Sequence, residues 1–284
     1  MNSHHFRIET GASNPIMRRV NTNLSRRPVL AAGGLAFALA LVCAVALGPF
    51  ARRAQSAENP FAGDRIAVPD GELIVHPLNH ATLALGWKEK VVYIDPVGGA
   101  RRFAGLPKPD LVLITHLHFD HFDKATLKDV VADKTVLVAP PTVAEQMPAE
   151  LRPQTTVLTN GQTKTVAGLA VEAVPAYNLT SGRTNFHPKG RDNGYVLTIG
   201  GARVYLSSDT EDVPEMRALK NIAVAFLCMN LPYTMEPDRA AQAVREFQPR
   251  LVYPYHCRGT NLEQFKSLVG NDAKIEVRLR NWYE

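Results

Sequence analysis

Residues 115–123 bring several metal-ligand side chains together in the run Thr-His-Leu-His-Phe-Asp-His-Phe-Asp. Imidazole and carboxylate groups in combination bind zinc, manganese or iron. A single histidine beside an apolar run is usually a core or surface residue, but four ligand-type residues at this spacing indicate a metal site. The motif therefore predicts metal binding by His116, His118, Asp120 and His121.

An apolar run, Leu111–Ile114, comes directly before the motif and is predicted to be a strand. If the strand ends there, the polar side chains fall into a loop at the edge of a sheet, where they can converge on a cation. In extended backbone, His116 and His118 point the same way because they are two residues apart. Asp120 and His121 can then turn toward a neighbouring point.

The surrounding chain alternates predicted strands and helices. Short runs rich in Val, Ile and Leu predict mostly antiparallel strands in the first half. Later strands at Ala223–Cys228 and Leu251–Tyr255 are separated by a helical stretch at Asp238–Phe247. We therefore expect a mixed α/β domain that begins near residues 57–63.

The motif resembles the HxHxDH signature of the metallo-β-lactamase superfamily, and three further residues follow in the order that this family expects. They are His187 in a loop, Asp209 after a predicted strand and His256 after another. The resemblance covers roughly residues 70–280. It implies a four-layer αββα sandwich, with metals at one edge between the two sheets.

The resemblance also implies two divalent metal ions, zinc or manganese, and a way to hold them. With Asp209 as the bridge, the ligand sets would be His116, His118 and His187 for one ion and Asp120, His121 and His256 for the other. Two such ions would lower the pKa of a shared water to about 7, so that a metal-bridging hydroxide would serve as the nucleophile.

Asp120 and His80 are the candidate catalytic residues. His80 would contact substrate or donate a proton at the rim, and the alternative is a hydrogen-bonded loop histidine. Asp95 and Asp123 are expected to orient ligand imidazoles. Cys257 is expected to pack away from the site, and the candidate pocket-lining residues are Tyr177, Asn178 and Tyr233.

Several segments resemble one branch of the superfamily, the L-ascorbate-6-phosphate lactonase-like group. That group is itself similar to the phospholipase D-type enzymes that cleave N-acyl phosphatidylethanolamine. The segments are Asn79-His80-Ala81, Ile94-Asp95-Pro96, Pro232-Tyr233-Thr234-Met235 and Tyr253-Pro254-Tyr255-His256. Asp209 at the bridging position differs from the lactamases that use a Cys ligand. Ser208-Asp209 departs from the more usual Gly-Asp, and an export signal does not fit the cytoplasmic lactonase, so the sugar phosphate substrate is not transferred.

Basic residues concentrate at the start of the chain. Residues 1–57 contain seven Arg and one Glu, which leaves 25 of the 32 Lys+Arg and 26 of the 27 Asp+Glu for residues 58–284. The second segment is therefore close to neutral, and we expect no nucleic-acid partner. The uncharged run Val29–Phe50 follows paired arginines, and Ser25-Arg26-Arg27-Pro28-Val29-Leu30 resembles a twin-arginine signal.

These patterns predict two parts of the chain. Residues 1–57 would be a twin-arginine-like signal peptide or an N-terminal membrane anchor, and residues 58–284 the metallo-β-lactamase-type catalytic domain. The domain would sit in the periplasm or on the outer face of a bacterial inner membrane, with membrane contact through the N-terminal segment.

The predicted function is a dinuclear metal-dependent hydrolase that cleaves an ester, lactone or phosphodiester bond in a small-molecule or lipid-like substrate. One alternative is a di-iron redox protein of the same fold. It is disfavoured because no flavin or iron–sulfur module accompanies the domain and iron-binding relatives usually replace one His with a carboxylate. Another alternative is a non-catalytic metal-binding member, which the completeness of the ligand set argues against.

Overall fold

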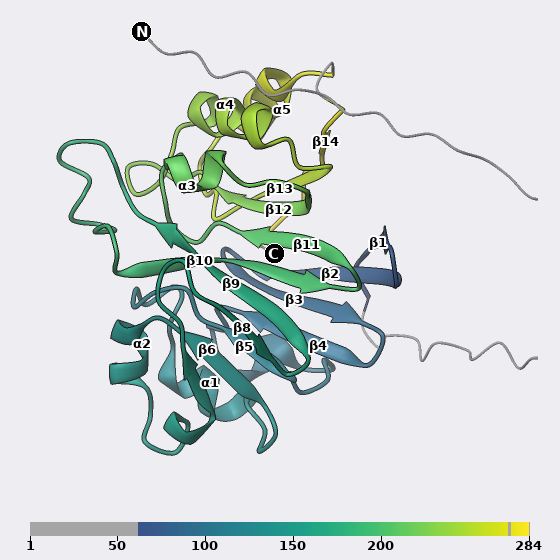
Figure 1. Ribbon diagram of the computed structural model, residues 1–284, viewed down its shortest axis with the longest axis vertical. Coiled ribbons are helices and arrows are strands. Elements are labelled where there is room, and N and C mark those ends of the chain that lie inside the picture. Colours follow the sequence, from purple (N-terminus) through teal and green to yellow (C-terminus); the bar gives the residue numbers. More distant parts are fainter. Residues whose placement is uncertain (1–61, 272–273, 284) are drawn as a thin grey trace, which may run out of the picture. The chain divides into compact units, whose positions relative to one another are not determined.

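Two seven-stranded sheets form the centre of the domain (Figure 1). The structure is a computed structural model and describes residues 62–271 and 274–283. The predicted leader, residues 1–57, lies outside the described residues. Within the part of the chain that is described, no helix has both the length and the apolar character needed to cross a membrane.

The first sheet joins strands β1 to β7 in sequence order. Neighbours from β1 to β4 are antiparallel and neighbours from β4 to β7 are parallel. Helix α1 (Lys124–Val130) connects β5 to β6, and helix α2 (Pro141–Gln146) connects β6 to β7. The strands are β1 Asp64–Val68, β2 Gly71–Asn79, β3 Thr82–Trp87, β4 Lys90–Ile94, β5 Leu111–Leu113, β6 Val136–Ala139 and β7 Thr155–Val157.

The second sheet has the order β14-β13-β12-β11-β10-β9-β8. Strands β8 to β11 pair antiparallel, and β11 to β14 pair parallel. Its strands are β8 Thr163–Val166, β9 Leu169–Ala176, β10 Asp192–Ile199, β11 Ala202–Leu206, β12 Ile222–Cys228, β13 Leu251–Tyr255 and β14 Glu276–Val277. Helices α3 (Pro214–Arg217), α4 (Pro237–Phe247) and α5 (Leu262–Val269) belong to this half.

Alternation along the strands builds the layers. In β2, Leu73 and Val75 belong to the core that the two sheets share, whereas Ile74 points to the opposite face and joins the cluster with α1 and α2. On α4, Ala240, Val244 and Phe247 are buried at the spacing of one helix face. Figure 1 shows α1 and α2 on one side of the sheets and α3, α4 and α5 on the other. The predicted mixed α/β, four-layer αββα class is confirmed.

Most strands and helices were predictable, including the three-residue strand β5, but some short elements were not. Strand β13 has the bounds predicted from sequence, Leu251–Tyr255, and the helix predicted at Asp238–Phe247 begins one residue earlier as α4. Strand β7 and helix α3, which have three and four residues, were not predicted. Elements this short carry too few residues to show a period of 2 or 3.6.

Candidate metal centre

The candidate ligands follow strands that run in the same direction. In the second sheet, β11, β12 and β13 are parallel, and Asp209 and His256 come just after β11 and β13. In the first sheet, β4 and β5 are parallel, and Asp95 and His116 come just after them. Because the carboxyl ends of parallel strands meet at one edge of a sheet, each sheet delivers its polar side chains to such an edge.

The motif segment forms a tight turn after β5. The backbone N–H groups of His121 and Phe122 both donate to the carbonyl oxygen of His118, each at 2.9 Å. Asp123 then begins α1, because its carboxylate accepts hydrogen bonds from the backbone N–H of Ala125 and of Thr126. The expectation that Asp123 orients a ligand imidazole is therefore wrong, and its carboxylate caps the helix instead.

A first group of side chains surrounds one point. Its ligand atoms lie within 4.8 Å of one another and belong to His116, His118, His187 and Asp209. The His116 Nε2 and His118 Nδ1 atoms are 3.1 Å apart, and His187 Nε2 is 3.4 Å from Asp209 Oδ2. All but His118 are buried. These are the residues expected at the first ion together with the expected bridge.

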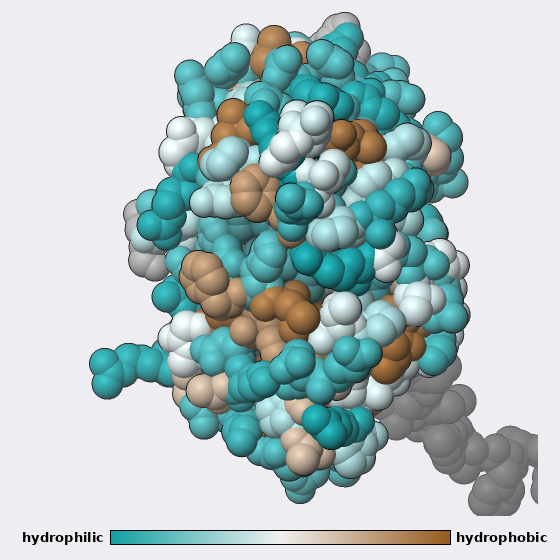
Figure 2. Space-filling view, turned by 90° about the vertical axis from the view of Figure 1, so that its left-hand side faces the viewer, coloured by the Kyte–Doolittle hydropathy of each residue, from teal (hydrophilic) through white to brown (hydrophobic). Residues whose placement is uncertain are grey.

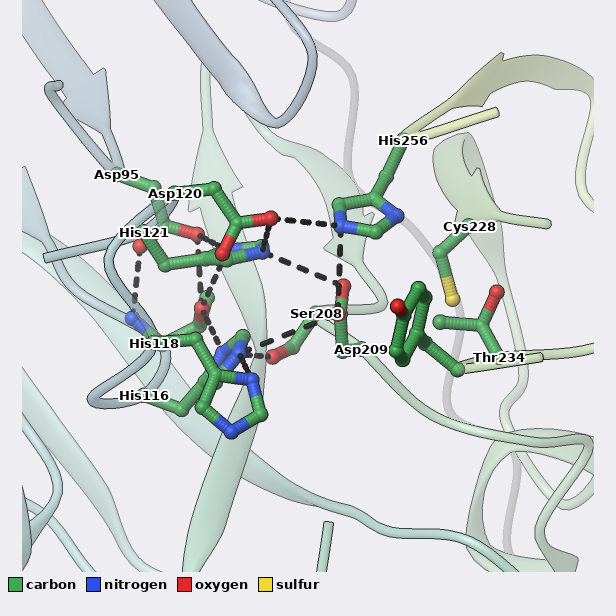
Figure 3. A network of polar contacts seen from close by, with 12 residues as sticks. Asp95, His116, His118, Asp120, His121, Ser208, Asp209, Cys228, Thr234 and His256 are labelled. Carbon is green, nitrogen blue, oxygen red and sulfur yellow. Dashed lines mark hydrogen bonds and ion pairs between the residues drawn. The ribbon is translucent and has the colours of Figure 1, made fainter. Parts of the chain in front are cut away.

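A second group lies on the other side of Asp209. His121 Nε2 is 3.4 Å from Asp209 Oδ1, and His256 Nε2 is 3.3 Å from Asp209 Oδ2. Asp120 Oδ2 lies 3.4 Å from His256 Nε2, 3.3 Å from His80 Nε2 and 3.8 Å from His121 Nε2. Figure 3 shows Asp209 between the motif histidines and His256. Among the described residues, Asp209 thus belongs to the first group and to a set with His121 and His256, whereas Asp120 shares a set with His80 and His256.

Several polar atoms at the centre of these groups suit a cation. Buried atoms without a hydrogen-bond partner include His121 Nε2, His187 Nε2, His256 Nε2 and Asp209 Oδ1. Buried polar groups are ordinarily satisfied, so four such atoms in one place need an explanation. Imidazole nitrogens and carboxylate oxygens are the donors that divalent zinc and manganese accept. The residues present therefore fit bound metal.

The charges of the cluster also favour a cation. Burial opposes ionisation of Asp209, yet the surrounding imidazoles of His256 and His121 hold its pKa well below the usual range. Burial alone would lower the pKa of His121, but the Asp209 and Asp95 carboxylates raise it to about 9. Burial keeps the pKa of His116 well below its ordinary value. The centre thus contains the ionised Asp209 carboxylate beside a neutral His116 imidazole that is able to bind metal, whereas His121 must release a proton before its Nε2 can bind an ion.

Two residues outside the groups orient ligand imidazoles. The fully buried Asp95 carboxylate lies 2.7 Å from His121 Nδ1 and also accepts from the backbone N–H of Thr115. Asn178 Oδ1 lies 2.6 Å from His187 Nδ1. Because each Nδ1 is engaged, the Nε2 atom of each ring faces the centre. The arrangement agrees with the expectation for Asp95, and it assigns Asn178 to His187 rather than to a pocket wall.

The structure brings all seven candidate ligands and His80 into one cluster. Their roles as ligands and catalytic groups stay predictions. Cys257 is 4% exposed, and burial raises the pKa of its thiol to about 11, which agrees with a packing role. Tyr177 is buried and its hydroxyl donates to Glu215, whereas Tyr233 is exposed.

Sequence reasoning missed Glu211, which holds the loop that leads to His187. Glu211 is 1% exposed, and its Oε2 atom accepts from the backbone N–H groups of Leu179 and Thr180, at 2.9 and 2.8 Å. The acid-rich run Asp209-Thr210-Glu211-Asp212 was the available signal. Of this run, the family resemblance pointed only to Asp209.

Comparisons with known proteins agree with this geometry. A family profile described as the β-lactamase superfamily domain matches residues 75–256, a range that contains all seven candidate ligands. A UPF0173 metal-dependent hydrolase of Thermococcus onnurineus (strain NA1) is 31% identical over 215 residues, which is 70% of this chain and 93% of that protein.

Two solved structures resemble the chain to different degrees. A protein of Parabacteroides distasonis ATCC 8503, described as a candidate metal-dependent hydrolase, has 39% sequence identity and a TM-score of 0.72 over 79% of this chain and 100% of that chain. CmlA, a diiron β-hydroxylase of Streptomyces venezuelae, has 18% identity and a TM-score of 0.50 over 69% of this chain and 45% of that chain, and so shares the fold alone. The family match and the hydrolase relatives together show that the chain belongs to the metallo-β-lactamase superfamily and is a metal-dependent hydrolase.

Proposed function

We propose that this hydrolase works with two divalent metal ions, zinc or manganese, that share Asp209. The observation that carries the proposal is the position of the Asp209 carboxylate. Its oxygens lie 3.3 to 3.4 Å from imidazole nitrogens of His187, His121 and His256. His187 belongs to the first group, and His121 and His256 belong to the second. A carboxylate with two oxygens can serve two ions, whereas one tetrahedral site would use only four of the seven candidate ligands.

Each side chain has a separate task in this proposal. The first ion would be held by His116, His118 and His187, and the second by Asp120, His121 and His256. Two ions held in this way would supply Lewis-acid chemistry: they would make a water molecule more acidic and would polarise the scissile bond. Asp95 and Asn178 keep the ligand rings aligned, and the buried setting strengthens every electrostatic contact in the site.

We propose that Asp120 and His80 are the catalytic side chains at the edge of the centre, where His80 contacts the substrate or donates a proton to it. Asp120 is the more exposed of the two, with 28% of its side chain accessible, and His80 Nε2 lies 3.3 Å from its Oδ2. The His80 ring lies beside the His256 ring, with 3.8 Å between the ring centroids and an angle of 36° between the ring planes. From this position His80 reaches substrate bound over the second group.

The substrate is proposed to be a small molecule or lipid-like compound with an ester, lactone or phosphodiester bond. Phe119 stands between two candidate ligands and is 88% exposed, so an apolar part of a substrate can contact it beside the centre. Figure 2 shows hydrophobic residues on the viewed face in separate groups among hydrophilic ones. Among these bond types, we favour lactones and phosphodiesters because of the resemblance to the lactonase-like branch and its phospholipase D-type relatives.

The test of this proposal is metal-dependent turnover. The purified full chain is loaded with zinc or manganese and assayed on chromogenic esters, lactones and phosphodiesters. We expect hydrolysis of at least one class, loss of activity with a chelator and recovery when metal is returned. His118→Ala should abolish turnover, and His76→Ala, which removes a histidine outside the candidate groups, should keep it. Hydrolysis that is indifferent to chelation would overturn the proposal.

The di-iron alternative rests on the fold shared with the diiron hydroxylase CmlA. The same purified chain distinguishes this redox alternative from the hydrolase. Oxygen consumption by the iron-loaded chain, with no hydrolysis in the zinc or manganese form, would favour a redox protein. Bound metal with neither reaction would favour a non-catalytic member.

We also propose that residues 1–57 direct the enzyme to the periplasm or hold it on the outer face of a bacterial inner membrane. Twin-arginine export needs both guanidinium groups, so changing Arg26 and Arg27 to Lys should leave the protein in the cytoplasm although the charge is kept. An ordinary anchor responds to positive charge and should tolerate this double change. Cell fractionation decides between the two: full export of the Lys variant contradicts the twin-arginine signal.

A further inference from the structure

We propose that Tyr283 is a positioning residue that fixes His80 as a hydrogen-bond donor toward the metal centre and so prevents it from acting as a ligand. The proposal rests on the proposed function, because it decides which of two roles His80 has there. By distance alone His80 qualifies as a ligand, since its ring nitrogen lies within 4.8 Å of ligand atoms of Asp120 and His256.

The hydrogen bonds at the Tyr283 hydroxyl define the state of His80. The backbone N–H of Cys257 donates to this oxygen at 2.9 Å, and a backbone amide can do nothing else. His80 Nδ1 is also 2.9 Å from the hydroxyl oxygen, and because His80 Nε2 faces the Asp120 carboxylate, which only accepts, we assign the ring hydrogen to Nε2 and the hydroxyl hydrogen to the bond with Nδ1. In this neutral ring Nδ1 is the acceptor. In a cationic ring both nitrogens carry hydrogen, so Nε2 is a donor in either form.

The Nε2 atom of His80 faces the centre, 3.3 Å from Asp120 Oδ2. A nitrogen that carries hydrogen has no lone pair for a metal ion. His80 therefore donates to Asp120 or to an oxygen of bound substrate.

Backbone contacts hold Tyr283 and His80 in register. The His80 N–H donates to the Trp282 carbonyl oxygen, and the His256 N–H donates to the His80 carbonyl oxygen, both at 3.0 Å. The Trp282 ring is 1% exposed, and its Nε1–H donates to the Pro254 carbonyl oxygen at 2.6 Å. The segment that carries Tyr283 is thus anchored on the end of β13, beside His256.

Removal of one hydroxyl group tests the assignment. Tyr283→Phe keeps the ring but leaves His80 Nδ1 without its donor, so the neutral ring is free to move its hydrogen from Nε2 to Nδ1. The matched control is Tyr93→Phe, which removes a hydroxyl that donates to the Pro107 carbonyl oxygen far from the centre. Thermal unfolding of both variants checks that each is folded.

The direct readout is the state of the His80 ring nitrogens in the ¹⁵N-labelled full chain, with His80→Gln used to assign the signals. In the wild-type protein and in Tyr93→Phe we expect Nε2 protonated and Nδ1 with the shift of an acceptor. In Tyr283→Phe we expect a change toward the Nδ1-protonated form. The proposal would be overturned if His80 of the wild-type protein were protonated at Nδ1 and not at Nε2. It would also be overturned if Tyr283→Phe left the protonation of both His80 nitrogens unchanged.

Kinetics give a second readout on whichever chromogenic substrate the full chain hydrolyses. Loss of one positioning hydrogen bond predicts that Tyr283→Phe lowers kcat about tenfold and changes KM less than about twofold. An equal fall for Tyr93→Phe would point to a general loss of stability and contradict the positioning role. The nitrogen spectra need no turnover, so failure of the proposed hydrolysis and failure of this inference remain distinguishable.

Discussion

The two sheets contribute to the metal centre in different ways. The first sheet supplies four candidate ligands from one short segment between β5 and α1, residues 116–121. The second sheet supplies three from three separate places: His187 between β9 and β10, Asp209 after β11 and His256 after β13. Half of the centre is therefore local in sequence, and the other half exists only once the second sheet has folded.

The supports of the two halves differ in the same way. Asp95 binds His121 with a buried carboxylate that is also fixed by the Thr115 N–H at the end of the neighbouring strand β5. On the other side, Asn178 binds His187 with a neutral amide, whose other end donates to the carbonyl oxygen of Tyr233 in a distant loop. In the first half, an acidic side chain close to the motif orients the ligand His121. In the second half, hydrogen bonds of the neutral Asn178 amide between two loops orient the ligand His187.

The largest expected effect comes from changing Asp209, a second-sheet residue, and it is compared with a change of His118 in the first-sheet motif. Asp209→Ala removes the carboxylate that faces both groups, so we expect hydrolysis to fall by about 10³-fold or more, which corresponds to several kcal/mol of transition-state stabilisation. His118→Ala removes one ligand of the first group and should be no more severe. Steady-state kinetics on metal-saturated protein compare them. A milder loss in Asp209→Ala than in His118→Ala would break the comparison, because the local motif would then dominate.

A smaller effect compares the supports. Asp95→Asn removes a charge that strengthens the ligand character of His121, and we expect metal affinity to drop about 10–100-fold. Asn178→Ala removes only an orienting amide from His187, so the loss should lie at the low end of that range. Competition with a chromogenic chelator measures both. A larger loss for Asn178→Ala would show that the second half depends more on its support than the first.

The smallest effect concerns two helix caps, one in each half. Asp123 caps α1 directly after the motif, and Asn261 Oδ1 accepts from the Gln264 N–H at the start of α5. Either residue changed to Ala should cost about 1 kcal/mol of unfolding free energy. Both variants should keep activity within about twofold. Denaturant titration and kinetics check this, and a selective loss of activity in Asp123→Ala would restore its predicted role beside the ligands.

What the sequence revealed follows the same division. The motif of the first half is a local pattern, so its residues and the strand before it could be predicted from spacing. The αββα class and the positions of Asp209 and His256 followed from the family resemblance together with strands that end just before them. The bounds of β13, Leu251–Tyr255, came directly from its apolar run.

The supporting contacts could not be predicted because they join residues that are remote along the chain. Asn178 meets His187 across a loop with no periodic pattern, and Tyr283 meets His80 across 203 residues. Asp123 misled the prediction for a physical reason. An aspartate beside a metal motif and an aspartate before a helix have the same local sequence, and only the hydrogen bonds of α1 distinguish them.

The number of metal ions bound per chain tests the central claim most directly. Elemental analysis of the full chain, saturated with zinc or manganese and freed of excess metal, should give two ions per chain for the wild-type protein and fewer for Asp209→Ala. A wild-type value that stays at one ion per chain under saturating metal would contradict a shared Asp209 and the dinuclear mechanism built on it.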